Sequence, residues 1–486
     1  MASDSDRPNI LFLFSDQQRP DWTGMNPDVP VRTQNLQRLA DRGVRFTNAV
    51  CPSPVCNPSR ASIASGYEYD RCGVTSNVFD YPLDRPTYYR RLRDEAGYHV
   101  MGCGKFDLQT GFSLGPTGDE GVERWGFSEA TFNPAKNNTL RRYLADSNDE
   151  PTDPYMRHLA ENGWLEAHVR DYHNRSFETG SGGTVEKDDA MWTATFPTPL
   201  PDSAYYDEWI TETGLELVRG APTDQPWFLE VNFQNPHHPW DVTESMYDLY
   251  RDPDVDFPEP VDSDLPVAAK THAEIRRNYA AMVEQIDSCV GRFLAALEER
   301  GELENTLVVF SSDHGEMLGD HGQWEKRSPR QPSVGVPLVM AGPGVEERDA
   351  VDCPATILDL HATFLDVAGV DPGDDVDSTS LAPFLAGEGE YPRDVVYSGL
   401  GPWRMVFDGR FKLVRGYDPD QARGDSREPM HVARSVAARR QRERDPILYD
   451  VTEGERTDLA TDRPGRVQAL TDRLTAIRDG PCERDA

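Results

Sequence analysis

Lysine is scarce in this chain of 486 residues, which has six lysines beside forty-four arginines and a formal net charge of −34. This charge argues against nucleic acid and anionic membranes as partners, because like charges repel. The acidic, lysine-poor composition predicts a halophilic-type surface that stays hydrated in concentrated salt. GC-rich coding alone also exchanges lysine for arginine, so this second explanation stays open.

Long apolar runs and a paired set of cysteines are also lacking. Seven cysteines is an odd number in a long chain, so no disulfide framework is predicted. No stretch reaches the roughly 20 apolar residues of a membrane-spanning helix. The N-terminus has neither the charged start nor the apolar centre of a signal peptide. We therefore expect a cytoplasmic protein without a membrane partner.

The order of apolar runs and amphipathic segments predicts a large α/β domain over residues 1–390. Its sheet is expected to be mostly parallel and flanked by helices. One helix should end at Gly43, as a glycine C-cap. The predicted strands are Asn9–Phe14, Val44–Phe46, Val100–Cys103, Trp227–Phe233 and Thr306–Phe310, and the predicted helices are Thr33–Gly43, Tyr206–Val218 and Ile275–Glu299.

Residues 391–486 contain several short strand-like runs in succession, a pattern that predicts a small C-terminal α+β subdomain. Short strands are expected at 395–400, 403–407, 411–415 and 447–449, followed by a helix at 464–477. These strands should form an antiparallel sheet. The basic run Arg434–Arg444 fits a solvated or salt-bridged helix, and a clamp for a polyanionic glycan is the alternative.

Two polar pairs follow predicted strands of the large domain. Asp16-Gln17 comes after the first strand, and Asp313-His314 comes after the strand that begins at Thr306. Ligands collect at the carboxyl ends of strands in open α/β sheets. Carboxylate, amide and imidazole groups together suit one divalent cation. Each aspartate taken alone also fits an N-cap.

The stretch CPSPVCNPSRASIASG, residues 51–66, places Cys56 at the predicted start of a helix, because Pro58 disfavours helix before it. A helix N-terminus favours anions and lowers the pKa of a thiol, and Arg60 could point at the same anion. A zinc site would need a second Cys/His pair nearby, which the sequence lacks. A Cys51–Cys56 disulfide is geometrically possible but disfavoured in a reducing cytoplasm. Cys51 better fits a buried structural role.

The run Cys56-Asn57-Pro58-Ser59-Arg60, with Ser65-Gly66 behind it, resembles the C-x-P-S-R signature of type I sulfatases in the alkaline phosphatase superfamily. The resemblance implies that a maturation enzyme converts Cys56 to formylglycine, whose hydrate attacks sulfur. It also implies one bound cation, Ca²⁺ before Mn²⁺. The implied metal ligands are Asp16, Gln17, Cys56, Asp313 and His314.

Three more segments resemble the family's motifs and occur in the family's order. Gly104–Leu108 is similar to a G-K-x-H segment, which implies that Lys105 binds sulfate, while Asp107 stands where histidine is usual. Asn235–Trp240 resembles an H-x-P element and implies His237 as the acid for the leaving alcohol, with His238 at the substrate. His321–Lys326, followed by Val336-Pro337, resembles the segment of the second sulfate lysine, Lys326.

These features predict a sulfatase that hydrolyses the sulfate ester of a small molecule or glycan, most simply a sulfated sugar. A phosphonate or phosphodiester hydrolase with the same fold is the nearest alternative, and Lys105 favours the sulfatase. A non-catalytic anion- or glycan-binding protein, in which Cys56 stays a thiol, is the alternative from another class. The expected catalytic residues are Cys56, Arg60, Lys105, His237 and Lys326, with Asp107 and His238 in substrate binding.

Overall fold

The computed structural model describes residues 7–82, 84–108, 122–145, 150–177, 194–252, 254–261, 269–348, 350–419 and 446–478. The basic run Arg434–Arg444 lies outside these ranges. Within them, no helix combines the length and the apolar character needed to cross a membrane.

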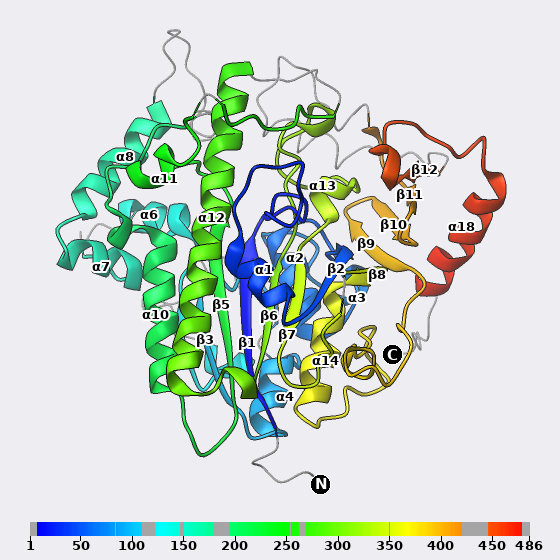
Figure 1. Cartoon of the computed structure of the whole chain (residues 1–486), viewed down its shortest axis with the longest axis horizontal. Helices are drawn as coiled ribbons and strands as arrows, with labels where there is room; N and C mark the ends of the chain where they lie inside the picture. Colours follow the sequence, from blue (N-terminus) through cyan, green and yellow to red (C-terminus); the bar gives the residue numbers. More distant parts are fainter. Residues whose placement is uncertain are drawn as a thin grey trace.

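An eight-stranded sheet forms the centre of the molecule (Figure 1). Its strand order is β4-β3-β5-β1-β6-β7-β2-β8, and β7 alone runs antiparallel to its two neighbours. The predicted mostly parallel sheet is therefore confirmed. The strands are β1 (Asn9–Asp16), β2 (Gly43–Val50), β3 (His99–Gly104), β4 (Glu129–Phe132), β5 (Trp227–Pro236), β6 (Thr306–Ser312), β7 (Leu338–Ala341) and β8 (Val351–Thr356).

Three of these strands were not predicted: β4, β7 and β8. Strands β4 and β7 have four residues each, which is too short for a periodic pattern to stand out. Strand β8 contains Pro354, a residue that argues against a central strand. The sheet accepts it because β8 lies at an edge.

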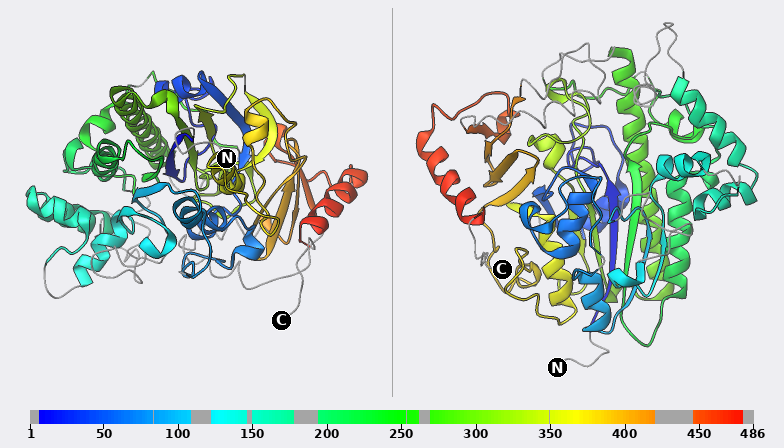
Figure 2. Two further views of the ribbon diagram at one scale, coloured as in Figure 1. Left: turned by 90° about the horizontal axis from the view of Figure 1, so that it is seen from below. Right: turned by 180° about the vertical axis from the view of Figure 1, so that it is seen from behind.

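Strand β1 shows how the sheet separates two apolar layers. Ile10, Phe12 and Phe14 point into one core, and Leu11 and Leu13 into the other, because side chains alternate along a strand. The first core also contains residues of α2, α4 and α14, whereas the second contains residues of α1, α10 and α12. Helices thus cover both faces of the sheet (Figure 2).

The three helices predicted by range are present as α1, α10 and α12, with changed ends, and α2 begins at Cys56 as expected. The predicted C-cap at Gly43 is wrong, because α1 ends at Ala40 and Gly43 begins β2. A Cβ at residue 43 would lie 2.1 Å from the carbonyl oxygen of Met340, so the position requires glycine for close strand approach. The helices are α1 (Gln34–Ala40), α2 (Cys56–Ser65), α3 (Tyr69–Cys72), α4 (Tyr88–Asp94), α5 (Val122–Trp125), α6 (Lys136–Ala145), α7 (Pro154–Glu161), α8 (Leu165–Phe177), α10 (Tyr206–Gly220), α11 (Glu244–Asp248), α12 (Ala269–Arg300), α13 (Gln331–Val334), α14 (Leu360–Val367) and α15 (Ala382–Leu385).

The C-terminal part forms a second, antiparallel sheet in the order β12-β11-β10-β9, as predicted. Helix α18 lies against it on the outer side (Figure 1). Apolar residues of this sheet and of α18, such as Leu413 and Leu470, belong to the same core cluster as Phe12. The small sheet is therefore packed into the large domain. Its elements are β9 (Val396–Leu400), β10 (Trp403–Phe407), β11 (Phe411–Arg415), β12 (Ile447–Asp450) and α18 (Pro464–Arg478).

Candidate active site

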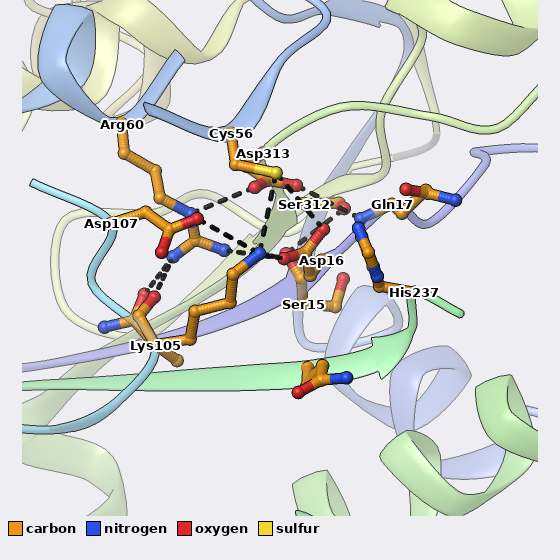
Figure 3. Close-up of polar contacts among 12 residues, drawn as sticks. Ser15, Asp16, Gln17, Cys56, Arg60, Lys105, Asp107, His237, Ser312 and Asp313 are labelled. Carbon is orange, nitrogen blue, oxygen red and sulfur yellow. Dashed lines mark hydrogen bonds and ion pairs between the residues drawn. The ribbon is translucent and has the colours of Figure 1, made fainter. Parts of the chain in front are cut away.

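Three segments that lie far apart in the sequence meet at the carboxyl ends of β1 and β6. Asp16 is the last residue of β1, Asp313 and His314 follow β6, and Cys56 begins α2. One ligand atom from each of these four buried residues lies within 4.8 Å of the other three. Asp16, Cys56, Asp313 and His314 therefore come together as the sequence predicts, and Figure 3 shows the first three of them pointing toward one another.

Helix α2 presents Cys56 from a buried position. All ten of its residues are buried, and five of them are alanine or serine, whose small side chains allow close packing. The Cys56 sulfur lies 3.2 Å from His314 Nε2 and 3.9 Å from Asp16 Oδ1. Cys51 is buried and makes no disulfide, so its structural role is consistent with the structure.

The expectation that the helix N-terminus lowers the thiol pKa is wrong. Burial and the carboxylate of Asp16 raise the pKa of Cys56 to about 12. The helix end offers little compensation, because Asn57 N donates to Asn77 Oδ1 at 3.1 Å and Pro58 has no N–H. The unmodified thiol is therefore neutral at ordinary pH and a weak nucleophile.

Asp16, Asp313 and His314 have the donor chemistry of a cation site. His314 Nε2 lies 3.7 Å from Asp16 Oδ1 and 3.6 Å from Asp313 Oδ1. Burial lowers the pKa of His314 to about 4, and its Nδ1 donates to the Gly315 carbonyl, which leaves a lone pair on Nε2. Two carboxylates and one neutral imidazole at these separations fit a divalent cation.

Gln17 has both amide atoms engaged. Its Oε1 accepts a hydrogen bond from Lys326 Nζ at 2.7 Å, and its Nε2 donates to Glu316. The backbone at Gln17 has a positive φ of 68°, and its N–H donates to Asp313 Oδ1 at 3.1 Å. Gln17 thus lies beside the cluster, and its role as a metal ligand stays a prediction.

Arg60 lies one turn along α2 and links several parts of the site. Its Nε donates to Asp313 Oδ2 at 2.9 Å, and its Nη1 donates to Asn232 Oδ1 at 2.6 Å and to the Lys105 carbonyl at 2.7 Å. Its Nη2 has no hydrogen-bond partner among the described residues and lies 3.9 Å from Asp16 Oδ2. Arg60 therefore orients Asp313, and the two N–H groups of its Nη2 have no acceptor within hydrogen-bond distance among the described residues.

Lys105 and Lys326 both place their amines 3.5 Å from the Cys56 sulfur. Lys105 also pairs with Asp16 and, at 3.1 Å, with Asp107 (Figure 3). Burial opposes its charge, yet Asp107 and Asp16 hold the pKa of Lys105 well above its ordinary value. An oxyanion at residue 56 would thus meet two amines that are already in place.

His237 lies beside the cluster and is half-buried (Figure 3). Burial, together with the charges of Lys326 and Lys105, holds the pKa of His237 well below its ordinary value. Its Nδ1 donates to the His238 carbonyl at 2.6 Å, and the two imidazole rings, tilted by 31°, have centroids 3.9 Å apart. The imidazole is therefore neutral, and Nε2 carries a lone pair instead of the proton that an acid needs.

Sequence reasoning assigned no role to Glu316 or Asn232. Glu316 accepts hydrogen bonds from the Gln17 side chain and from Glu325 N, which lies next to Lys326. Asn232 accepts from Arg60. Polar residues at alternate positions of the buried strand β5, Glu230, Asn232 and Gln234, were the available signal for the second of these.

The sequence profile of the sulfatase family matches residues 8–370. The chain belongs to the sulfatase family. A choline-sulfatase of Rhizobium meliloti is 29% identical over 461 residues, which cover 88% of this chain and 82% of that protein. An N-acetylglucosamine-6-O-sulfatase of Bacteroides thetaiotaomicron is 26% identical over 414 residues, with 80% and 72% covered.

Solved structures agree on the fold. The phosphonate monoester hydrolase of Agrobacterium radiobacter is similar to this sulfatase with a TM-score of 0.75 and 22% identity, covering 97% of this chain and 95% of that chain. The predicted family and its alkaline-phosphatase-like fold are thus confirmed. The protein is a sulfuric ester hydrolase by family, which argues against a non-catalytic binding protein.

Proposed function

We propose that this sulfatase hydrolyses a sulfate ester carried by a sugar, after conversion of Cys56 to formylglycine and with one divalent cation. The observation that carries the proposal is the meeting of Cys56, Asp16, Asp313 and His314 beside two buried lysine amines. The relative named as an N-acetylglucosamine-6-O-sulfatase supports a sugar as the alcohol part of the ester.

Asp16, Asp313 and His314 would hold the cation, with Gln17 and residue 56 as further ligands. We propose Ca²⁺ first because carboxylate oxygens dominate the donor set, and the imidazole makes Mn²⁺ its competitor. A bound cation supplies positive charge that neutralises sulfate and lowers the pKa of a hydroxyl next to it.

Arg60, Lys105 and Lys326 would bind the negatively charged sulfate oxygens. Their positions are fixed before the substrate arrives, because each side chain already has buried partners. Such preorganised charge stabilises a transition state more than mobile charge does, since no reorganisation is needed during the reaction. Asp107 orients Lys105 through the contact of 3.1 Å.

His237 would serve the leaving alcohol, with His238 beside the substrate. The neutral imidazole can donate a proton only if a bound ester raises the pKa of His237, and the negative charge of sulfate acts in that direction. Once protonated, Nε2 could give its proton to the alkoxide oxygen while Nδ1 keeps its bond to the His238 carbonyl.

The test compares Cys56→Ala with the matched variant Cys51→Ala, after expression with a formylglycine-generating enzyme. Cys56→Ala should lose nearly all turnover and keep its fold, whereas Cys51→Ala removes a buried thiol five positions away and should stay active. Peptide mass spectrometry should find formylglycine at position 56 in active protein. An active preparation with only unmodified thiol at Cys56 would refute the proposal.

The substrate class is tested with a panel of sulfated sugars, choline sulfate, aryl sulfates, phosphonate monoesters and phosphodiesters. We expect the largest kcat/KM for a sulfated sugar. A preference for phosphonate monoesters would instead establish the alternative hydrolase.

The requirement for a cation is tested by chelation. Chelation should abolish turnover, and added Ca²⁺ or Mn²⁺ should restore it, while near-native far-UV circular dichroism shows that the chelated protein stays folded.

A further inference from the structure

Lys326 lies in an irregular segment between β6 and β7, and the residues on both sides of it have left-handed backbone angles. Glu325 has a φ of 65° and Arg327 a φ of 83°, and neither is glycine. Such angles are unfavourable for residues other than glycine and persist only where surrounding contacts hold them. The position of the Lys326 amine therefore depends on what holds its segment.

Much of what holds this segment comes from the small C-terminal sheet and from residues that follow its strands β11 and β12. Trp403 Nε1 in β10 donates to the Arg327 carbonyl at 3.1 Å. The Tyr417 hydroxyl accepts from Gln323 Nε2 at 3.2 Å and lies 3.1 Å from Ser328 Oγ. One buried hydroxyl thus joins the two ends of the segment that carries Lys326.

A second set of contacts fixes the residues that follow. Gln331 N donates to Glu455 Oε2 at 2.6 Å, and Arg330 Nη1 donates to the Glu455 carbonyl at 2.5 Å. Lys412 Nζ in β11 donates to Gln331 Oε1 at 3.1 Å and pairs with Glu455 at 2.7 Å. The C-terminal sheet therefore contacts this segment at Arg327 and at Gln331, and Tyr417, two residues after β11, contacts it at Ser328.

We propose that the C-terminal sheet positions Lys326 for sulfate, with Tyr417 and Trp403 as positioning residues. The inference rests on the proposed function, because it assumes that Lys326 binds the sulfate group. It gives the small sheet a role in the reaction although, in the described part of the chain, its strands supply none of the residues that surround the Cys56 sulfur.

The test is Tyr417→Phe, which removes one hydroxyl and keeps the ring. We expect kcat/KM to fall roughly 3- to 30-fold, mainly through kcat, because a displaced amine loses transition-state contacts. Tyr397→Phe is the matched control: Tyr397 is also buried in this sheet, but its hydroxyl donates to Asp70 at 2.5 Å. Tyr397→Phe should change kcat/KM less than twofold.

A double-mutant cycle with Lys326→Ala distinguishes the positioning of Lys326 by Tyr417 from a general structural role of Tyr417. If Tyr417 acts through Lys326, Tyr417→Phe should have no further effect on kcat/KM or on the Kd of inorganic sulfate in that background. Full additivity, or equal effects of Tyr417→Phe and Tyr397→Phe, would overturn the inference. If Tyr417→Phe does not fold, Trp403→Phe takes its place in the same cycle.

If the proposed function itself is wrong, the same measurements should give a different result. In that case Lys326→Ala itself would leave sulfatase turnover and sulfate affinity unchanged. If Lys326→Ala is severe and only the cycle with Tyr417 fails, the sulfate role stands and the positioning role alone is rejected.

Discussion

Two regions of the molecule bury a lysine against carboxylates, the active-site end of the large sheet and the small C-terminal sheet. Among the described residues, Lys105 contacts two carboxylates, those of Asp16 and Asp107, whereas Lys412 contacts one, that of Glu455, together with the amide oxygen of Gln331. At Lys105 the two carboxylates outweigh burial and raise the pKa of the amine. At Lys412 burial outweighs Glu455 and lowers it.

The difference shows how a buried site can hold a charged lysine that is available to a ligand. A buried lysine with one carboxylate partner, such as Lys412, forms a structural ion pair, which we call a closed pair. A lysine with two carboxylates stays charged, and one of these carboxylates can turn to another cation while the other keeps the amine in place. In the active site, Lys105 can therefore keep one carboxylate partner while the other binds a different cation. In the small sheet, the ion pair of Lys412 and Glu455 serves the structure.

The few lysines of this chain lie mostly in buried positions. Five lysines lie in the described part of the chain, and all but Lys270 are buried. Lysine offers a compact charge with three donors, which arginine cannot replace at a confined position. The buried ones are Lys105, Lys136, Lys326 and Lys412, each with a polar side-chain partner.

The largest effect on stability should come from Lys412→Met. It leaves the carboxylate of Glu455 buried without its cation, which costs about 3–5 kcal/mol. The double variant Lys412→Met/Glu455→Gln should recover most of this loss, because no charge is then left unpaired. Denaturant unfolding measures both. Equal stability of the single and double variants would contradict the closed-pair interpretation.

Lys105→Ala should act on activity instead. Loss of one charge-assisted contact to the reacting group costs roughly 2–4 kcal/mol, so kcat and kcat/KM should fall together by about 30- to 1,000-fold. Steady-state kinetics on the preferred sulfate ester provide the measurement. A rise in KM with unchanged kcat would show that Lys105 only assists binding.

Asp107→Asn sharpens the comparison within the active site. If Asp107 orients Lys105, its loss should lower kcat/KM by roughly 3- to 10-fold, the usual range of one hydrogen bond. The double variant with Lys105→Ala should then be little worse than Lys105→Ala alone. An effect near that of Cys56→Ala, with a changed acid limb of the pH profile, would show that Asp107 moves a proton.

The smallest effect on stability for each charged group is expected at the protein surface. The formal net charge of −34 repels itself over a Debye length of about 30 Å at 0.01 M salt, which shrinks to about 3 Å at 1 M. Thermal scans should therefore show a melting temperature that rises with KCl or NaCl. A melting temperature that stays flat from dilute buffer to molar salt would remove the prediction of a salt-requiring surface.

Much of the fold could be predicted because its signals are local. The apolar run of β1, the long helix α12 and the strands of the small sheet follow from side-chain periodicity and turn residues. Strands β4 and β7 are too short for such signals, and Pro354 concealed β8. Gly43 was misread because the neighbouring strand, and not the helix before it, requires a glycine there.

The residues of the site were predictable from motifs, but their protonation states were not. The chemistry of Cys56 was expected from its place at a helix start, yet burial and Asp16 decide its pKa. The predicted acid His237 is neutral for a similar reason, since Lys326 and Lys105 lie near it. These effects depend on distances between segments that the sequence does not show.

The sequence by itself determined the family, the α/β architecture and the residues that stand at the strand ends, because each of these is written in short motifs and periodic patterns. Only the tertiary structure decided that two lysines flank the Cys56 sulfur and that Tyr417 joins the ends of the Lys326 segment. Tyr417 and Ser328 are 89 positions apart, as are Lys105 and Asp16. Contacts over such separations arise from packing, which no local pattern specifies.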